Sequence, residues 1–383
     1  MNGNILIKPS VQQKFDRVMQ SGRILFFSAP CGFGKTVVAN ALLRKWRTLC
    51  LRADAPDFSL QVLPDEWDIL LIDDFQLLQE QETSQMLCEL IRANPARRFV
   101  FLSRGVPPAY LTAFQYTGLM TTLEPDDLLF DHEDIRNFFA SCKVAVTESE
   151  INGILKESIG YPLGVAITAR QMSDGKSFSP ELTAHTYREV FAYFEAAVYN
   201  RFDLPVRRLL LELSLFEDFD MEMVRMVSGD PRAGERMDWL LRHTTMLRYD
   251  SRERFHFWAG FRAFLLWEMD REYTEEKRKA LFSRGGLYYE LKEDYARALE
   301  CYTQGGDHTR VAELLVRNAD NAEVLRQVRL TLMKILAHEG PVFGASSREC
   351  GNYRSLSLAS AKTEAQRYLS ELDARPVTFK YEE

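Results

Sequence analysis

The sequence predicts a chain of several domains, in which an α/β domain with a parallel sheet is followed by a mostly helical remainder. The length of 383 residues favours about two or three domains. In the first third, short apolar runs alternate with polar stretches of helical spacing, which is the pattern of a parallel sheet covered on both faces. Beyond Glu124 the strand pattern fades and helical spacing takes over.

Composition and charge are those of an ordinary globular protein. Hydrophobic residues make up 46% of the chain and charged residues 27%, which excludes wholesale disorder. The net charge of −7 shows that the chain as a whole lacks the excess of basic residues with which proteins bind nucleic-acid phosphates. This overall charge is compatible with a local basic patch. The sequence shows no signal peptide and no apolar run of membrane-spanning length, so we expect a cytoplasmic protein without a membrane partner. Scattered cysteines without a CxxC pair predict reduced thiols and no structural zinc.

The α/β domain is expected over residues 1–125. Its strands are predicted where apolar runs are continuous, and a helix is predicted directly after the first of them. The predicted strands are Arg23–Ala29, Thr48–Ala53, Asp68–Ile72 and Arg98–Leu102, and the predicted helix is Thr36–Trp46.

The helical remainder divides into four predicted parts. They are a small helical domain (126–185), a winged-helix-like domain (186–270), helical hairpins similar to tetratricopeptide repeats (271–335) and a partly disordered tail (336–383). In the small domain, helices are expected at Asp131–Phe139, Glu148–Ile159 and Leu163–Met172.

The winged-helix prediction rests on helices followed by a short hairpin. Asp203 and Asp220 can cap two of the helices, and the hairpin strands are expected at Met246–Tyr249 and Arg254–Phe257. The repeat prediction rests on two segments that echo each other, DYARALE and DHTRVAE, although two ordinary amphipathic helices explain them equally well. In the tail one helix is expected, at Lys362–Leu372.

A phosphate-binding loop is predicted in the stretch SAPCGFGKT, which follows a buried strand and opens a helix. Backbone N–H groups from Gly32 to Thr36 would point at a phosphate, and Gly32 and Gly34 would leave room for its approach. Lys35 would reach the β- and γ-phosphates, and the Thr36 hydroxyl would bind Mg²⁺. The pattern GxxxxGK[ST] has Ala29 in place of its first glycine, and alanine is small enough to be tolerated. The alternative is a glycine-rich turn before a chance Lys–Thr pair.

Polar side chains follow two more of the predicted strands. Asp73 and Asp74 end one strand, so Asp73 would hold Mg²⁺ and Asp74 would orient or deprotonate an attacking water at the same sheet edge. Ser103 and Arg104 end another, and a guanidinium suits a γ-phosphate because it is always charged and forks onto phosphate oxygens. The alternatives are an acidic turn and a surface arginine.

Other signals are weaker. Cys31 lies at a predicted helix N-terminus, where a thiolate would be favoured and would allow a redox role. His256 lies between two phenylalanines, and we expect it to be packed rather than to bind a ligand. The motif Gly160–Leu163 alone is equally well a plain turn between helices. The sequence contains no Ser/His/Asp triad, metal-binding cluster or dinucleotide fingerprint that competes with the phosphate loop.

The order of these motifs resembles the N-terminal part of the large ATP-binding LuxR-type transcriptional regulators. These regulators belong to the signal-transduction ATPases with numerous domains (STAND). The resemblance covers roughly residues 5 to 320, and the ordered set is fairly specific although the phosphate loop is generic. Family members often carry alanine at the position of Ala29. The motifs are APCGFGKT, LLIDDFQ, FVFLSRGVPP, LLFDHEDIRNFF, GYPLGVAITA, FRAFL and YYELKEDYARALECYTQGGDHTRVAELL.

The resemblance implies a P-loop NTPase domain and roles that spacing does not supply. Ser103 and Arg104 would sense the γ-phosphate, and Pro162 would pack on the nucleotide base. The winged helix would hold an ADP-bound resting state closed and would not itself bind DNA. The helical repeats would receive an inducer or protein regulator, and ATP together with the inducer would allow self-association.

Three departures from the family pattern stand out. Lys35 and Asp73 are only 38 residues apart, so a helix or strand of the nucleotide domain is expected to be missing. The winged-helix histidine that normally contacts ADP is replaced in the stretch 258–260, with His256 displaced from it. The stretch after Gly340 lacks the pair of patterned helices of a DNA-binding helix-turn-helix, so no direct DNA binding is expected of this chain.

These observations predict an ATP/ADP-dependent signal-transduction switch with slow Mg²⁺-dependent ATP hydrolysis. Asp74 and Arg104 are its expected catalytic residues. One alternative is a non-catalytic nucleotide-binding scaffold, for example an antagonist of longer relatives. Another is an ATP-driven remodelling enzyme, which would show rapid turnover and a constitutive ring.

Overall fold

The computed structural model describes residues 5–78, 80–318, 321, 325–326, 329–330, 332–333, 363, 366–367 and 369–370. The chain divides into two compact units. The first contains Met1–Arg201 and Glu235–Arg248, and the second contains Phe202–Gly234 and Tyr249–Glu383.

A parallel five-stranded sheet of order β2-β3-β4-β1-β5 forms the centre of the first unit. The strands are β1 (Ile24–Ser28), β2 (Thr48–Arg52), β3 (Ile69–Asp73), β4 (Arg98–Ser103) and β5 (Met120–Leu123). The first four confirm the predicted strands to within one residue at either end. The fifth was missed because its sequence, MTTL, contains no continuous apolar run.

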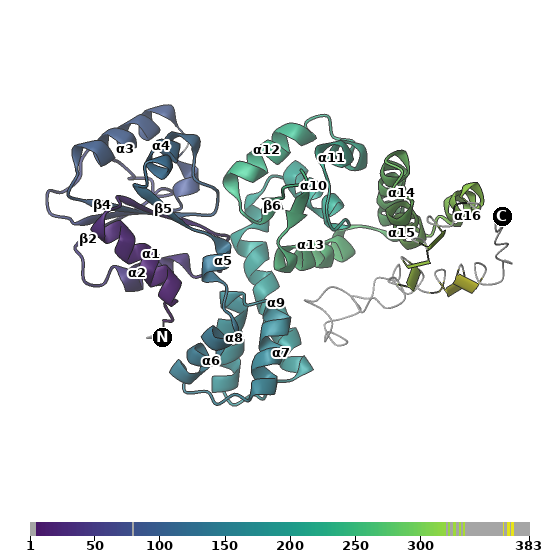
Figure 1. Cartoon of the computed structure of the whole chain (residues 1–383), viewed down its shortest axis with the longest axis horizontal. Helices are drawn as coiled ribbons and strands as arrows, with labels where there is room; N and C mark the ends of the chain where they lie inside the picture. The colour runs from purple at the N-terminus through teal and green to yellow at the C-terminus, as the bar shows by residue number, and fades with distance from the viewer. Residues whose placement is uncertain are drawn as a thin grey trace, which may run out of the picture. The chain divides into compact units, whose positions relative to one another are not determined.

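Helices cover both faces of the sheet, which confirms the predicted fold class. Figure 1 shows α1 and α2 on one face of the sheet and α3 and α4 on the other. Every residue of β1 is buried, as a strand between two helical layers requires. The four helices are α1 (Pro9–Gln20), α2 (Lys35–Leu42), α3 (Gln81–Ala93) and α4 (Thr112–Tyr116).

The register of the sheet gathers three loops at one edge. Ser28 at the end of β1 is level with Ser103 at the end of β4. Strand β3 pairs with the other side of β4, with Ile72 level with Phe101. The residues that follow β1, β3 and β4 therefore emerge side by side at the carboxyl edge, where ligands bind in open α/β sheets.

A helical segment follows the sheet within the first unit. Its own core contains Ile135, Phe139, Ile154 and Val165, all buried. Asp131 and Thr147 cap two of the helices through capping boxes. The helices are α5 (Pro125–Leu128), α6 (His132–Ser141), α7 (Glu148–Ser158), α8 (Pro162–Ser173) and α9 (Pro180–Ala197), followed by the 3₁₀ turn η3 (Tyr199–Arg201). Helix α9 runs through the position at which the sequence places a domain boundary, between residues 185 and 186.

The winged-helix region contains the predicted helices and hairpin strands. Asp203 and Asp220 each accept a backbone N–H at the start of a helix, as their positions predict. Gly229 ends the second of these helices with a φ of 61°. The elements are α10 (Leu204–Ser214), α11 (Met221–Ser228), α12 (Ala233–His243), β6 (Leu247–Tyr249), β7 (Phe255–Phe257) and α13 (Ala259–Glu272).

Helical hairpins follow in the second unit, where α14 packs along α15. The two echoing segments fall largely in successive helices, α15 and α16. The bounds are α14 (Glu275–Leu291), α15 (Tyr295–Gly305) and α16 (His308–Arg317). Of the predicted helix Lys362–Leu372 the structure describes residues 363, 366–367 and 369–370, which are helical, and most of the predicted tail lies outside the described residues. Within the described part of the chain, no helix is long and apolar enough to cross a membrane.

Candidate functional site

A cavity of about 780 Å³ lies in the first unit, where the loop after β1 meets the carboxyl edge of the sheet and helix α8. This volume is within the range of small-molecule sites in proteins. Most of the residues singled out from the sequence line it, whereas Ser103 is not among its lining residues. Those that line it are Gly32, Gly34, Lys35, Thr36, Asp73, Asp74, Arg104 and Pro162.

The loop after β1 depends on two glycines. Gly32 and Gly34 have φ values of 74° and 78°, in the left-handed region that favours glycine. A Cβ atom on Gly32 would also lie 1.8 Å from the hydroxyl oxygen of Tyr161. Ala29, which departs from the glycine pattern, has no positive φ, and its N–H donates to the Ser103 carbonyl at 3.2 Å. Alanine therefore fits at this position without strain.

Lys35 at the start of α2 is folded back onto its own loop. Its Nζ donates to the carbonyl oxygens of Ala29 and Pro30, at 2.7 Å and 2.8 Å. Burial lowers the pKa of Lys35 to about 8. A buried ammonium bound only by carbonyls lacks a full counter-charge, which an anionic ligand in the cavity would supply.

Cys31 in the same loop does not have the character expected from the sequence. Burial raises the pKa of its thiol to about 11, and this outweighs the opposite effect of the nearby Lys35 and Arg104. The expectation of a favoured thiolate at the helix N-terminus was therefore wrong. The thiol is protonated at neutral pH, which argues against a redox role.

Thr36 and Asp73 form the oxygen-rich side of the cavity. The Thr36 hydroxyl donates to Asp73 Oδ2 at 3.1 Å, and the other oxygen of Asp73 accepts the Asp74 N–H at 2.8 Å. A hydroxyl beside a carboxylate suits Mg²⁺, which prefers oxygen ligands and completes its shell with phosphate and water. The described residues contain no group of three or more His, Cys, Asp or Glu side chains that could hold a metal ion. A metal here would be shared with a ligand.

Asp74 and Arg104 are paired with each other. Arg104 Nε lies 3.2 Å from Asp74 Oδ1, and Arg104 Nη1 donates to the Ala197 carbonyl at the end of α9 at 2.9 Å. Gln76 links the pair, since its Nε2 donates to Asp74 Oδ1 and its Oε1 accepts the Arg104 N–H, both at 2.9 Å. Sequence reasoning missed Gln76, although it stands two residues after Asp74 in the same motif.

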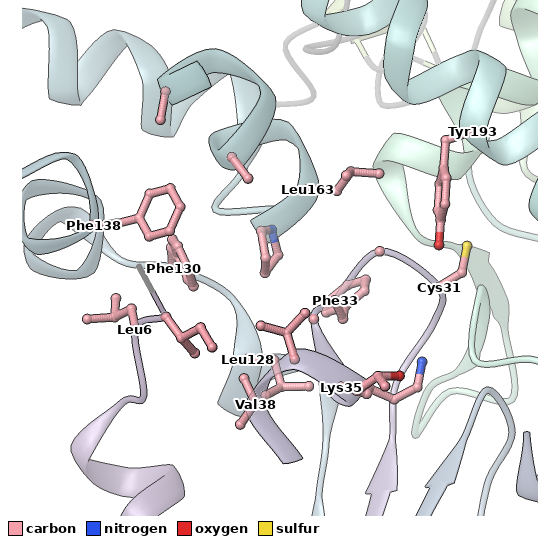
Figure 2. Close-up of a pocket in the computed structure, with 18 of the residues that line it drawn as sticks. Leu6, Cys31, Phe33, Lys35, Val38, Leu128, Phe130, Phe138, Leu163 and Tyr193 are labelled. Carbon is pink, nitrogen blue, oxygen red and sulfur yellow. The ribbon is translucent and has the colours of Figure 1, made fainter. Parts of the chain in front are cut away.

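Sequence reasoning also missed two tyrosines. Tyr161, completely buried, donates its hydroxyl to the Cys31 carbonyl at 3.0 Å. Burial raises the pKa of Tyr161 well above its ordinary value, so the hydroxyl keeps its proton. Tyr193 on α9 also lines the cavity, and burial raises the pKa of its hydroxyl. Figure 2 shows the Tyr193 side chain above the loop, with its hydroxyl oxygen near the sulfur of Cys31.

The opposite part of the cavity is mainly apolar, although Lys8, Arg170 and Asp174 also line the cavity. Its walls come from the segment before α1, from α2, from the region around α5 and from α6 and α8 (Figure 2). Pro162 at the start of α8 belongs to this part. A flat, largely apolar group fits such walls, with charged groups directed toward Lys35. The labelled apolar residues of these walls are Leu6, Val38, Leu128, Phe130, Phe138 and Leu163, and the labelled Phe33 belongs to the loop after β1.

Two sequence-predicted residues have other surroundings. Ser103 is buried, and its hydroxyl accepts the Gly105 N–H at 3.0 Å, which fixes the turn after β4. His256 on β7 lies with Nε2 2.8 Å from Asp250 Oδ2. The hydrogen bond from His256 lowers the pKa of Asp250 to about 2. His256 is thus a half-exposed partner of a carboxylate rather than only a packed residue.

Comparison with protein families gives two matches on different parts of the chain. The family model of the MalT winged helix domain matches residues 195–277. The family model of S-ribosylhomocysteinase (LuxS) matches residues 306–377, most of which lie beyond the continuously described part of the chain. The second match was not foreseen from the sequence, where this stretch was expected to contain part of the helical hairpins and a loose tail.

Individual proteins agree with these matches. The HTH-type transcriptional regulator MalT of Serratia proteamaculans is 22% identical over 301 residues, which are 75% of this chain and 32% of that protein. The chain thus spans about a third of the length of that relative. The S-ribosylhomocysteine lyase of Thermus thermophilus is 51% identical over 47 residues, which are 12% of this chain and 30% of that protein.

A solved structure supports the fold. The Walker-type ATPase PABY2304 of Pyrococcus abyssi superimposes with a TM-score of 0.53 at 12% identity, covering 68% of this chain and 96% of that one. At this identity the likeness concerns the fold alone. Together with the sheet order and the glycine-rich loop after β1, it identifies the fold of the first unit as that of a P-loop NTPase.

Proposed function

Because this chain is MalT-like, with a MalT winged helix domain at residues 195–277 and a P-loop NTPase fold, we propose that it is a nucleotide-dependent regulatory switch. The switch binds ATP and ADP together with Mg²⁺. The observation that carries the proposal is a single cavity that joins the glycine loop, Lys35 and the Thr36–Asp73 pair to an apolar chamber.

Phosphate groups occupy the polar part of the cavity in this proposal. The N–H groups of residues 32–36 and the ammonium of Lys35 bind phosphate oxygens, and Lys35 exchanges its two carbonyl partners for them. Thr36 and Asp73 hold Mg²⁺, which when bound offsets phosphate charge. Pro162 and its apolar neighbours pack on the base.

Slow hydrolysis of ATP is the finer part of the proposal. Asp74 orients or deprotonates the attacking water, and Arg104 stabilises the charge on the γ-phosphate. Both groups must first leave the ion pair that joins them, because a carboxylate engaged by a guanidinium and by Gln76 is a poor base. This requirement supports a low turnover rate.

The same ion pair favours the alternative of a non-catalytic nucleotide-binding scaffold. In that case the Asp74–Arg104 pair is a permanent structural contact. ATP turnover of the wild type and of Asp74→Asn separates the two functions. A wild-type rate above that of the variant supports the switch, and identical near-zero rates support the scaffold.

The regulatory role is proposed from the similarity to MalT, which its name describes as a transcriptional regulator. The helical hairpins from α14 onward are the proposed site for an inducer or protein regulator. Self-association that depends on the nucleotide is the proposed output. Analytical ultracentrifugation with ADP and with a non-hydrolysable ATP analogue tests this output, and an unchanged sedimentation coefficient contradicts it.

Nucleotide binding itself is tested with Lys35→Ala. We expect the wild type to bind ADP saturably and the variant to lose binding, because the Lys35 ammonium lies in the phosphate loop and its hydrogen bonds go to two uncharged carbonyls. Lys45→Ala makes the same chemical change at an exposed position and serves as the matched control. Equal ADP affinity in all three proteins would contradict the proposed site.

A further inference from the structure

One side chain, Gln76, bridges the two residues to which the hydrolytic step is assigned. Its Nε2 donates to Asp74 Oδ1 and its Oε1 accepts the backbone N–H of Arg104, both at 2.9 Å. A backbone N–H can only donate, so the amide oxygen of Gln76 must face Arg104. The NH₂ group of the amide is therefore the side that faces the Asp74 carboxylate.

The turn that carries Gln76 is anchored to the sheet. Gln76 lies in the 3₁₀ turn η1 (Phe75–Leu77), which begins directly after Asp74. Asp74 has a φ of 52°, in the left-handed region that aspartate enters more readily than most residues. The Phe75 ring is buried and stacks on Phe101 of β4, with ring centroids 4.4 Å apart. The amide and the carboxylate are thus carried by one short turn with a fixed base.

Asp74 uses a single oxygen for both of its side-chain partners. Arg104 Nε lies 3.2 Å from Oδ1, which is the oxygen that Gln76 also contacts. Among the residues that the structure describes, no hydrogen bond reaches the other oxygen, Oδ2. Asp74 lines the cavity, whereas Gln76 is not among the lining residues. Gln76 therefore acts on the carboxylate and not directly on a ligand.

We propose that Gln76 is a positioning residue for hydrolysis. When Arg104 leaves Asp74 for the γ-phosphate, the amide keeps hold of Oδ1, and Oδ2 stays available to the attacking water. The inference rests on the hydrolytic part of the proposed function and adds to it a residue outside the cavity. Gln76 itself takes no part in bond making or breaking.

The need for such a residue follows from the freedom of a carboxylate. The last torsion of an aspartate side chain has a broad energy well, so the ion pair and the amide are what fix its two oxygens. Opening the ion pair removes one of these restraints. A group that acts on water contributes to the rate only while it is held in the right geometry. A neutral donor on Oδ1 holds that geometry and leaves the negative charge on the carboxylate.

Two reciprocal substitutions separate the donor and the acceptor of Gln76. Gln76→Glu keeps an acceptor for the Arg104 N–H but places a second negative charge against Asp74. Gln76→Lys keeps a donor to Asp74 but cannot accept the Arg104 N–H. Gln115→Glu makes the same chemical change as Gln76→Glu at an exposed position of α4 and is the matched control.

The experiment measures steady-state ATP turnover with Mg²⁺ in a phosphate-release assay for the wild type and the three variants. We expect Gln76→Glu to lower kcat by about tenfold or more, which is the range of one hydrogen bond to a charged group. Gln76→Lys should lower kcat less, and Gln115→Glu should match the wild type. The KM for ATP and the ADP affinity of the Gln76 variants should stay within about threefold, because Gln76 does not line the cavity.

A purely structural role of Gln76 predicts the opposite order. If the amide only anchors the loop after β4 through the Arg104 N–H, Gln76→Glu keeps its turnover and Gln76→Lys loses it. That order, or equal losses in both variants, would overturn the inference. Thermal melting and ADP titration show whether each variant is folded. Should Gln76→Lys not fold, Gln76→Glu still decides, since a kcat within about twofold of the wild type contradicts the proposal.

Failure of the proposed function is distinguishable from failure of this inference. Wild-type turnover that Asp74→Asn abolishes, together with unaffected Gln76 variants, refutes the role of Gln76 alone. A wild type that binds ADP but does not turn over ATP refutes the hydrolytic part of the proposed function and the role of Gln76 with it. A wild type that binds no ADP refutes the proposed site as a whole.

Discussion

Raising the pH above 8 should weaken ADP binding through Lys35. The side chain is buried against the Ala29 and Pro30 carbonyls, and burial lowers the pKa of Lys35 to about 8. A bound phosphate stabilises the charged ammonium, so the complex keeps the lysine protonated well above this pH. Affinity is therefore full below pH 8 and is lost as the pH rises, because binding must then take up a proton.

The magnitude follows from the fraction of charged lysine in the free protein. With a pKa of Lys35 of about 8, this fraction falls from about nine tenths at pH 7 to about one tenth at pH 9, and the ADP dissociation constant rises about tenfold. Calorimetric titration at both pH values measures the change. Repeating the titration in buffers of different ionisation enthalpy counts the protons taken up for each ADP bound. We expect nearly one proton at pH 9 and almost none at pH 7.

The thiol of Cys31 is the nearest competing explanation, but burial raises its pKa to about 11, so it stays neutral over this range. Cys31→Ser should keep the same pH dependence as the wild type. ADP affinity that is equal at pH 7 and pH 9, without proton uptake, would refute the reasoning. Tighter binding at pH 9 would refute it as well.

Three further predictions concern the loop, the hydrolytic carboxylate and the helical core. Gly32→Ala should weaken ADP binding by more than about tenfold, because the left-handed conformation costs an alanine about 1–2 kcal/mol and the new Cβ would lie 1.8 Å from the Tyr161 hydroxyl oxygen. Gly118→Ala is the control: this glycine also has a positive φ, of 72°, but open space around it, so the variant should bind ADP normally. Asp74→Asn should reduce ATP turnover to background in a phosphate-release assay while ADP affinity stays within about twofold, since the carboxylate acts on water rather than on the bound phosphates. Phe139→Ala should lower the free energy of unfolding by about 3–5 kcal/mol in chemical denaturation, because the ring is completely buried in the helical core; a loss under about 1 kcal/mol would contradict that packing.

Local patterns determine the parts of the fold that could be predicted from the sequence. Strands β1 to β4 are continuous apolar runs, because helices cover both faces of the sheet. The helix caps Asp203 and Asp220 act on N–H groups three residues away, so short-range rules identify them. The glycine loop after β1 likewise carries its conformational requirement in its own residues.

The missed features depend on contacts between distant parts of the chain. Tyr161 meets a carbonyl 130 positions earlier, and Arg104 meets the end of α9 93 positions later, which no local pattern shows. The pKa of the Cys31 thiol was predicted wrongly, because the sequence shows the neighbouring helix N-terminus but not the burial that the tertiary structure imposes. Strand β5 was missed because two threonines interrupt its apolar pattern.

The central claim is that the cavity beside the glycine loop binds a nucleotide through Lys35. Calorimetric titration of ADP with Mg²⁺ at pH 7 into the wild type, Lys35→Ala and Lys45→Ala tests it directly. We predict saturable binding with one site per chain for the wild type and for Lys45→Ala, and no measurable binding for Lys35→Ala. Absence of binding by the wild type, or equal binding by Lys35→Ala, would contradict the account.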